Sequence, residues 1–327
     1  MSGTMHPKKS TNGRTFAPAL RAVRTGFRVL SPRAPALAAR WAERLFLTAR
    51  RHQRPIWESQ ALSTATHDRL AHEGAWLPTW TWTPSADASD MTNATPATLE
   101  DLPTVILVHG WEGRGSQLAA FVPELLTRGF RVVTFDAPGH GDAPSKRASL
   151  VDHARALCTL GRALGPVHAV IGHSVGGAAT LLATRYGFRA ERLALIAPPT
   201  TPTSYLDVFT RTLDLAPDVE EAMIARLEAR YSVEFEELDV RVDAERLHQP
   251  MLVVHDHDDP IVPFASGEAI VGAAPRGKLV GVSALGHRAI LRATHVVDTV
   301  VRFVGDQDAT SFARTLDGEL FMRDMRW

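Results

Sequence analysis

The chain has 327 residues, 45% of them hydrophobic and 22% charged, which is the composition of an ordinary globular protein long enough to bury a large core. Its 36 basic and 36 acidic residues give a formal net charge of zero, which argues against a nucleic-acid-binding protein. No apolar run approaches the ~20 residues that cross a bilayer, and the first residues lack the apolar segment of a signal peptide, so we expect a cytoplasmic protein.

The balanced charge conceals an uneven distribution along the chain. Residues 1–56 hold twelve of the 36 basic residues but only one of the 36 acidic residues, Glu43. The remainder of the chain therefore holds 24 basic and 35 acidic residues. The single cysteine, Cys158, excludes an intrachain disulfide and is typical of a reducing compartment. We therefore expect a basic N-terminal arm, residues 1–56, joined to an acidic body.

The basic arm contains two predicted helices after a polar start, residues 1–15, that we expect to be disordered. In Phe16–Leu30 the apolar side chains recur at helical spacing beside three arginines, Arg21, Arg24 and Arg28, and Pro35–Arg50 repeats the apolar spacing. Two interpretations of the first helix stay open. It packs on the body with its arginines in water, which we favour, or it makes peripheral contact with an anionic membrane or a partner. A transit peptide has a similar composition, and we favour it less.

Gly74–Thr83 has the alternating pattern of a β-strand. Its three tryptophans fall on one face, and we expect them to pack in the core rather than to form a ligand platform. Pro78 lacks the N–H that a second neighbouring strand requires, which predicts an edge strand. The Ala-, Ser-, Asp- and Thr-rich stretch that follows, Pro84–Pro103, is predicted to be a flexible loop.

From Thr104 onward, strand and helix patterns alternate. The predicted strands are short and apolar: Val105–Val108, Phe130–Phe135, Val167–Ile171, Arg192–Ala197, Met251–Val254 and Lys278–Val282. The predicted helices are Gln117–Arg128, Leu150–Leu164, Ala265–Gly272 and Ala289–Val304. Repeated strand–helix units with near-continuous apolar strands predict an α/β fold, with a mostly parallel central sheet, helices on both faces, and ligands at the carboxyl ends of the strands.

The strand pattern stops over residues 200–249. Asp218–Tyr231 instead places apolar residues at helical spacing. We expect residues 200–249 to form a small helical cap insertion over the strand ends. The predicted organisation is therefore the basic arm, an α/β domain over residues 57–304 that includes the cap, and a C-terminal tail over residues 305–327, which carries no recognisable pattern.

The predicted strand Val167–Ile171 runs into Gly172-His173-Ser174-Val175-Gly176 and then into a helical stretch of small residues. Gly-x-Ser-x-Gly between strand and helix is the pattern of a nucleophile elbow, in which a sharp, strained turn exposes the serine hydroxyl above the sheet. Glycines fit there because a Cβ would crowd the neighbouring strand and helix. Ser174 is the candidate nucleophile, although the pentapeptide alone also fits a glycine-rich turn with a solvated serine.

A serine hydroxyl attacks well only when an imidazole takes its proton and a carboxylate orients that imidazole. In strand–helix domains with this elbow, the acid and the histidine follow later strands in the order Ser, acid, His. The acidic stretch His255–Asp259 follows Met251–Val254, and Gly286-His287 follows Lys278–Val282. These stretches hold the candidate acid and base, whereas we expect His295, inside the last predicted helix, to pack or to lie at the surface.

With these motifs the chain resembles the α/β-hydrolase superfamily over roughly Pro103–Val304, as a serine esterase or lipase with a helical cap insertion. The resemblance implies an α/β-hydrolase fold. In that family the acid commonly appears as Gly-x-x-Asp-x-x-Val-Pro, and Asp259-Pro-Ile-Val-Pro263 matches this pattern with Asp259 as the acid. Asp256 stands where the family has glycine, so Asp258 stays as a second candidate. The Gly-His pair is similar to the family's base, which makes His287 the candidate.

The resemblance also implies an oxyanion hole made of two backbone N–H groups. One belongs to Val175, directly after the nucleophile, and the other to Trp111, in the loop after the strand that ends at His109-Gly110. A plain strand-ending turn is the alternative for this segment, and the glycine-rich loop that follows favours the functional interpretation. Asp136–Gly141 is also typical of the family and receives no chemical role.

These residues predict a serine hydrolase that cleaves a small-molecule carboxylic ester through an acyl-enzyme. An acyltransferase would use the same three side chains, and a non-catalytic ligand receptor on this fold is a further alternative. Serine at the elbow argues against dehalogenases and epoxide hydrolases, which carry aspartate there. Acyl and alcohol specificity and the oligomeric state stay open.

The segment His255-Asp256-His257-Asp258 has the residue types of a metal site. No second His/Asp cluster with ligand spacing accompanies it along the chain. We therefore expect neither a metal nor another cofactor.

Overall fold

The computed structural model describes residues 13–84, 102–305 and 322–323. Three predictions fall largely or wholly outside these residues: the disordered start (1–15), the flexible loop (84–103) and the C-terminal tail (305–327). Among the described residues, no helix combines the length and apolar character needed to cross a bilayer.

The described chain forms two compact units. The first, which we call the helical unit, comprises the described part of Met1–Phe46 together with Thr203–Glu237. The second, the sheet unit, comprises the described parts of Leu47–Pro202 and Leu238–Trp327. The predicted domains divide the chain differently, because they separate the basic arm from the insertion, whereas helices of both belong to the helical unit.

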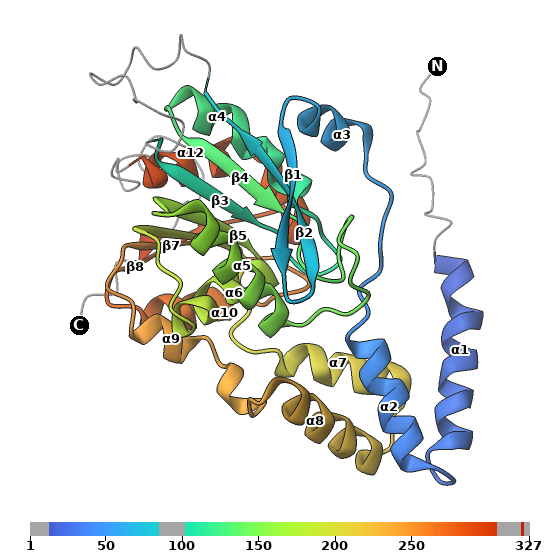
Figure 1. Ribbon diagram of the computed structural model, residues 1–327. Coiled ribbons are helices and arrows are strands. Elements are labelled where there is room, and N and C mark those ends of the chain that lie inside the picture. Colours follow the sequence, from blue (N-terminus) through green and yellow to red (C-terminus); the bar gives the residue numbers. More distant parts are fainter. Residues whose placement is uncertain (1–12, 85–101, 306–321, 324–327) are drawn as a thin grey trace, which may run out of the picture. The chain divides into compact units, whose positions relative to one another are not determined.

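Four helices lie in the helical unit as the structure describes it: α1 (Gly13–Leu30), α2 (Pro35–Phe46), α7 (Thr203–Leu213) and α8 (Pro217–Tyr231) (Figure 1). Aromatic contacts join them. The buried ring of Phe27 stacks on Trp41 with 4.3 Å between ring centroids, and Phe46 meets Phe209 edge-on at 5.2 Å. Helices α1 and α2 thus share an apolar interior with α7, which lies far from them in the sequence. Neither segment could form this interior alone.

Basic residues of α1 bind the end of α7. Arg24 Nε donates to the Thr212 carbonyl oxygen at 2.7 Å, and Arg28 forms an ion pair with Asp214 at 3.3 Å. A helix C-terminus has unpaired carbonyl groups and a negative dipole end, so arginine side chains are favourable there. These contacts support the packed interpretation of the first helix, although its partners are α2 and α7, and membrane contact stays a prediction.

The described residues of the sheet unit form a nine-stranded sheet in the order β1-β2-β4-β3-β5-β6-β7-β8-β9 (Figure 1). Its strands are β1 (Thr66–His72), β2 (Ala75–Trp82), β3 (Thr104–Val108), β4 (Arg131–Phe135), β5 (Ala169–His173), β6 (Arg192–Ile196), β7 (Met251–Asp256), β8 (Gly277–Val282) and β9 (Met322–Arg323). Strands β4, β3, β5, β6, β7 and β8 pair in parallel, and the pairs β1–β2, β2–β4 and β8–β9 are antiparallel. The predicted mostly parallel sheet is confirmed.

The remaining helices belong to the sheet unit, with α3 before the first strand and the others between strands: α3 (Ile56–Leu62), α4 (Val122–Thr127), α5 (Leu150–Leu164), α6 (Val175–Arg185), α9 (Arg241–Glu245), α10 (Phe264–Ala273), α11 (Gly286–Ala289) and α12 (Thr294–Val304). Short 3₁₀ turns accompany them: η3 (Gly115–Phe121), η4 (Glu236–Leu238) and η5 (Ile290–Arg292). The structure has two elements, η3 and α4, where the sequence predicts the single helix Gln117–Arg128. A new helix begins at α4 because Pro123 has no N–H and fits only the first turn of a helix. The last predicted helix divides at Ala293, whose backbone is extended.

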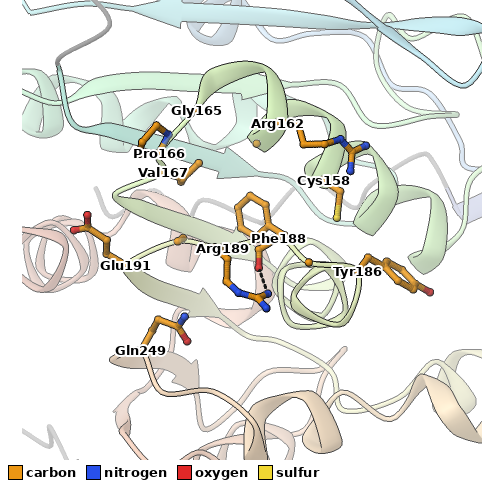
Figure 2. Close-up of a pocket in the computed structure, with 13 residues that line it drawn as sticks. Cys158, Arg162, Gly165, Pro166, Val167, Tyr186, Phe188, Arg189, Glu191 and Gln249 are labelled. Atoms are coloured by element: carbon orange, nitrogen blue, oxygen red, sulfur yellow. Dashed lines mark hydrogen bonds between the residues drawn. The ribbon is translucent and has the colours of Figure 1, made fainter.

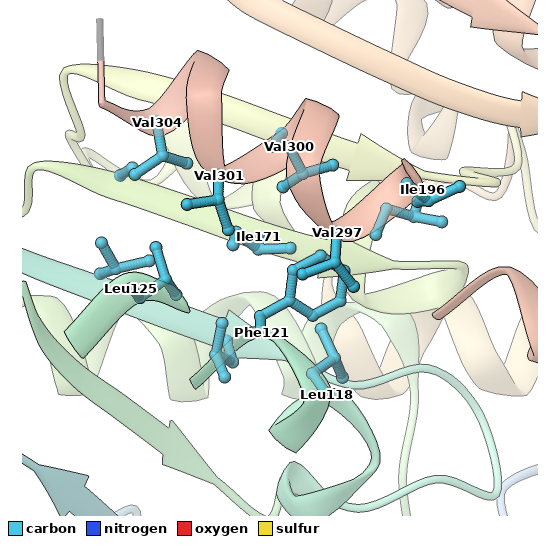
Figure 3. Packing of buried hydrophobic residues seen from close by; sticks show 14 of the residues in the cluster. Leu118, Phe121, Leu125, Ile171, Ile196, Val297, Val300, Val301 and Val304 are labelled. Atoms are coloured by element: carbon cyan, nitrogen blue, oxygen red, sulfur yellow. The ribbon is translucent and has the colours of Figure 1, made fainter. Parts of the chain in front are cut away.

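Successive strand residues point to opposite faces of the sheet, and helices cover both faces. Ile171 of β5 lies on the face covered by α12 and the η3–α4 segment, together with Phe121 and Val297 (Figure 3). On the other face α10 approaches β7 so closely that a Cβ added to Gly267 would lie 3.2 Å from Val253 Cγ1. This double cover explains why β3, β5 and β7 are buried along their whole length, as predicted.

The predicted edge strand lies inside the sheet. β2 pairs with β1 on one side and with β4 on the other, so the edge prediction is wrong. Pro78 is tolerated because its carbonyl accepts the Asp136 N–H at the end of the β2–β4 ladder, and the missing N–H would point to that same side. The sequence does not predict β1, because its residues are mostly polar and exposed. Two of the three tryptophans of β2 pack in the core, as predicted.

Candidate active site

β5 and α6 meet at Ser174 in a sharp turn. Ser174 has φ 54° and ψ −125°, a strained conformation for a residue other than glycine. A Cβ on Gly172 would lie 2.9 Å from the carbonyl oxygen of Gly176, and a Cβ on Gly176 would lie 2.4 Å from the carbonyl oxygen of Val108. The turn therefore has the geometry of a nucleophile elbow and requires glycine at both positions.

Loops that follow three parallel strands bring Ser174, Asp259 and His287 together. His287 Nε2 lies 2.9 Å from Ser174 Oγ, and His287 Nδ1 lies 2.7 Å from Asp259 Oδ2. An ionised carboxylate only accepts hydrogen bonds, so Nδ1 carries the proton and Nε2 presents its lone pair to the serine hydroxyl. Ser174 and His287 are only 4% and 7% exposed. His295 lies elsewhere, in α12.

The Asp259 carboxylate is built into its own turn. Oδ1 accepts the N–H groups of Ile261 and Val262 at 2.8 and 3.0 Å, while Oδ2 faces His287. Burial opposes the charge, but the hydrogen bonds from His287, Ile261 and Val262 outweigh it and lower the pKa of Asp259 below its ordinary value. The carboxylate is therefore ionised at neutral pH. The structure places Asp259, and not the second candidate Asp258, against His287.

The two predicted oxyanion donors lie in segments next to Ser174. Val175 is the first residue of α6, so its N–H belongs to the helix end where unpaired donors and the dipole favour negative charge. The Gly110 backbone lies against Ser174, since a Cβ added there would be 2.9 Å from Ser174 Cβ. Trp111 follows directly. The assignment of these N–H groups to an oxyanion hole stays a prediction.

Buried carboxylates anchor the loop after β3. Arg114 donates from Nη2 to Glu58 Oε1 at 2.9 Å, and the Gly115 N–H donates to Asp136 Oδ1 at 2.8 Å. Burial raises the pKa of Asp136 to about 6, although two backbone N–H groups act in the opposite direction. Asp136, at the end of β4, thus joins the loops after β3 and β4, which is a structural rather than a chemical role.

Three fully buried histidines pack together beside these loops: His109, His140 and His153. Their ring centroids lie 5.2, 5.3 and 4.8 Å apart. Each Nδ1 lies against a backbone carbonyl oxygen, so each Nδ1 carries the proton and donates. Burial lowers their pKa values, to about 4 for His140 and about 3 for His153, and the rings are neutral. Each of these hydrogen bonds is local, because the carbonyl belongs to a residue one to four positions away along the chain.

The histidines of the His255–Asp259 stretch have partners of their own. His255 Nε2 lies 3.0 Å from the Val262 carbonyl oxygen, and the His257 ring stacks on Phe264 with 3.9 Å between ring centroids. Within the part of the chain that the structure describes, no group of three His, Cys, Asp or Glu residues could hold a metal ion.

A groove of about 730 Å³ lies at the other end of the strands (Figure 2). Its lining includes Gly165–Val167, which precedes β5, and Phe188–Glu191, which precedes β6. These segments enter the strands at their amino ends, whereas Ser174 leaves β5 at the carboxyl end. The groove is therefore separate from the candidate active site.

A sequence profile of the alpha/beta hydrolase family matches residues 105–303. This range contains the parallel strands, the elbow and the three candidate catalytic side chains. The chain belongs to the alpha/beta hydrolase family, as the motifs predict, and the order of its strands and the sharp turn at Ser174 agree with that membership.

Individual relatives are distant. The chain is 26% identical over 246 residues to the pimeloyl-acyl-carrier protein methyl ester esterase of Aromatoleum aromaticum, a match that covers 61% of this chain and 96% of that enzyme. It is 38% identical over 115 residues to the sn-1-specific diacylglycerol lipase ABHD11 of Mus musculus, covering 33% of this chain and 38% of the lipase. The solved structure of an esterase from Exiguobacterium antarcticum has the same fold, with a TM-score of 0.54 at 14% identity over 73% of this chain and 99% of that chain.

Proposed function

We propose that the protein is a serine hydrolase that cleaves carboxylic esters through an acyl-enzyme intermediate. The observation that carries this proposal is the continuous contact chain from Ser174 Oγ through His287 to Asp259, with distances of 2.9 and 2.7 Å. A hydroxyl, an imidazole and a carboxylate in this order provide a nucleophile, its base and the group that orients the base.

In the acylation step, His287 Nε2 takes the hydroxyl proton while Ser174 Oγ attacks the carbonyl carbon of the ester. The N–H groups of Trp111 and Val175 stabilise the negative charge on the tetrahedral intermediate. His287 then protonates the departing alcohol, and the acyl group stays on Oγ. Asp259 remains ionised and stabilises the transient imidazolium.

In the deacylation step, His287 Nε2 removes a proton from water, and the resulting hydroxide attacks the acyl-enzyme carbonyl. Collapse of the second tetrahedral intermediate breaks the bond to Ser174 Oγ, which recovers its proton from His287. The carboxylic acid leaves. Every proton transfer in the cycle therefore passes through one imidazole.

The relatives support an ester as the substrate. One is named for a methyl ester and another for diacylglycerol, and both substrates contain a carboxylic ester bond. We therefore assign a small-molecule carboxylic ester as the substrate class.

Hydrolysis of a panel of acyl esters with different chain lengths tests the proposal. The native protein should release free acid, and Ser174→Ala and His287→Ala should each lower kcat/KM on the order of 10⁴-fold. The exposed Ser59→Ala variant is the matched control and should keep native activity. A panel without any hydrolysis would refute the proposal, and a product formed by transfer to an added alcohol in place of free acid would identify an acyltransferase.

A further inference from the structure

The nucleophile strand contacts the backbone of the candidate base. His173 Nε2 lies 2.8 Å from the carbonyl oxygen of His287. A carbonyl oxygen only accepts, so Nε2 carries the proton and donates it. Because His173 directly precedes Ser174 at the end of β5, this hydrogen bond joins the segment of the nucleophile to that of the base.

His173 is buried and neutral. It is 4% exposed, and its ring centroid lies 4.7 Å from that of His287 at an interplanar angle of 45°. Among the described residues its Nδ1 has no hydrogen-bond partner. Burial lowers the pKa of His173 to about 3, so the ring adds no positive charge beside His287. Among the described residues, the ring therefore makes one polar contact, the hydrogen bond that Nε2–H donates to the His287 carbonyl oxygen.

A second group holds the same segment from β7. Asp256 Oδ2 accepts the N–H groups of Leu285 and Gly286, each at 2.6 Å, and Oδ1 accepts the N–H of Asp258 at 2.7 Å. The side chain is completely buried. One carboxylate thus links the turn that leads to Asp259 with the turn that leads to the candidate base.

The segment before His287 is one that needs support. Ala284 and Gly286 both have a left-handed backbone, with φ of 60° and 68°. Glycine adopts such a conformation without strain, but at Ala284 it persists only where surrounding contacts determine it. The two N–H groups bound by Asp256 and the carbonyl bound by His173 belong to three successive residues, Leu285, Gly286 and His287.

We propose that His173 and Asp256 are positioning residues, a backbone clamp that fixes the imidazole of His287 between Ser174 and Asp259. The inference rests on the proposed function, in which His287 is the base. Neither residue touches the reacting atoms. Since a misplacement of about 1 Å can cost a catalytic group ~100-fold in rate, loss of the clamp should lower kcat and leave KM unchanged.

A pair of amide substitutions at His173 tests the hydrogen bond itself. The glutamine amide places a donor near the position of Nε2, whereas the shorter asparagine amide ends near Nδ1 and cannot reach the His287 carbonyl. His173→Gln should keep kcat within a few-fold of the native value, and His173→Asn should lower it about 10–100-fold with unchanged KM. Thermal unfolding of both variants shows that they are folded, and the exposed His248→Asn variant is the control.

Asp256 gives an independent test on the other side of the clamp. Asp256→Ala removes the acceptor of three backbone N–H groups, and Asp256→Asn keeps one acceptor oxygen. Asp256→Ala should lower kcat more than Asp256→Asn does, again without a change in KM. If Asp256→Ala does not fold, kcat of Asp256→Asn is compared with that of the native protein. A lower kcat at unchanged KM supports the clamp, and a native kcat contradicts it.

A spectroscopic measurement separates the clamp from turnover. The proton on His287 Nδ1, held by Asp259, should give a downfield resonance in proton NMR that is present in the native protein and in His173→Gln, and weakened or lost in His173→Asn. If the native protein hydrolyses no ester while this dependence holds, the proposed function fails and the clamp stands. If a folded His173→Asn variant keeps both native kcat and the resonance, the clamp is wrong.

Discussion

Buried histidines hold backbone segments near the carboxyl ends of the strands: His109, His140, His153, His173 and His255. Each has a ring nitrogen 2.8–3.1 Å from a backbone carbonyl oxygen, to which it donates. Burial lowers the pKa of every one of them, because a positive ring would lose its hydration. They serve as neutral donors, and acid should therefore destabilise the folded protein.

We predict that His153→Asn makes the protein less sensitive to acid. The pKa of His153 is lowered to about 3 from an ordinary value of 6.5, so the unfolded chain takes up a proton first as the pH falls. Stability is then lost between these two values at up to ~1.4 kcal/mol per pH unit for one histidine. Asparagine keeps a donor near Nδ1 and takes up no proton. Urea unfolding between about pH 7 and 5 should show that the variant loses less of its free energy of unfolding than the native protein does.

The exposed His248→Asn variant is the control for this measurement, because its side chain meets solvent in both states. Asp136 acts in the opposite sense: its pKa is raised to about 6, so the folded protein binds that proton first and gains stability as the pH falls toward 3.8. Comparison of variant and native protein removes this contribution. If the free energy of unfolding changes equally with pH in His153→Asn and in the native protein, the prediction is contradicted.

We predict that Gly176→Ala destabilises the elbow. The added Cβ would lie 2.4 Å from the Val108 carbonyl oxygen, and backbone atoms cannot move aside as a flexible side chain can. The expected loss is about 1–3 kcal/mol in the free energy of unfolding, accompanied by lower kcat. Gly305→Ala is the control, because the nearest atoms to its added Cβ lie at 3.4 Å. Native stability of Gly176→Ala would show that the turn relaxes freely.

Among individual residues, the sequence predicts the candidate nucleophile, acid and base, because each stands in a short motif with a fixed order along the chain. It does not single out His173 or Asp256. Their contacts exist only where the loops after β5, β7 and β8 meet, and no local pattern encodes that meeting. One signal is present in the sequence, since Asp256 replaces a glycine of the family pattern.

Among the secondary-structure elements, α2 and α8 are joined through one carboxylate. Glu43, the single acid of residues 1–56, accepts from Arg226 Nε at 2.6 Å and from Arg230 Nε at 2.7 Å. Burial opposes its charge, but the hydrogen bonds from Arg230 and Arg226 outweigh it and lower the pKa of Glu43. A lowered pKa means that this contribution to stability is present at neutral pH and is lost as the pH falls through the folded-state pKa.

We predict that Glu43→Gln lowers the free energy of unfolding of the helical unit by about 2 kcal/mol, because two arginines lose their charged acceptor. Thermal and urea unfolding followed by circular dichroism measure the change. Glu124→Gln, at an exposed position of α4, is the matched control and should unfold as the native protein does. Identical unfolding of Glu43→Gln and native protein would mean that the ion pairs contribute nothing.

We predict that deletion of residues 1–30 weakens the helical unit without abolishing hydrolysis of a soluble short-chain ester. The deletion removes Phe27, which covers the Trp41 ring, and Arg24, which binds the end of α7. The candidate catalytic side chains all lie in the sheet unit. Deletion of residues 1–12 is the control for chain length. Complete loss of activity in the longer deletion alone would show that α1 is needed for catalysis, and loss of binding to anionic vesicles would support the membrane interpretation.

Elements with a strong hydrophobic period are predicted well from the sequence, and elements defined by their neighbours are not. The six parallel strands are apolar on both faces and appear at the expected positions. The position of β2 inside the sheet depends on β1, whose polar residues give no strand pattern. The break before α4 depends on where Pro123 falls in the turn. The contact of α2 with α8 joins segments too far apart in sequence for any local pattern to reveal.

For the molecule as a whole, the fold explains why three distant residues can act together. Parallel strands end at one edge of the sheet, so the loops after β5, β7 and β8 converge there, and each supplies one side chain of the candidate site. Family membership could be predicted from the motifs, since the order Ser, acid, His is a property of this sheet topology. Substrate specificity could not, because it depends on side chains that tertiary structure brings together.

A fluorophosphonate reagent tests whether His287 activates Ser174 as a nucleophile. The rate at which the reagent modifies the protein is measured, and mass spectrometry locates the adduct. Such a reagent reacts with a serine whose proton is removed by a neighbouring base. We expect a single adduct on Ser174 in the native protein and a reaction at least ~1,000-fold slower in His287→Ala. An adduct at another residue, or equal rates for the native protein and His287→Ala, would contradict it.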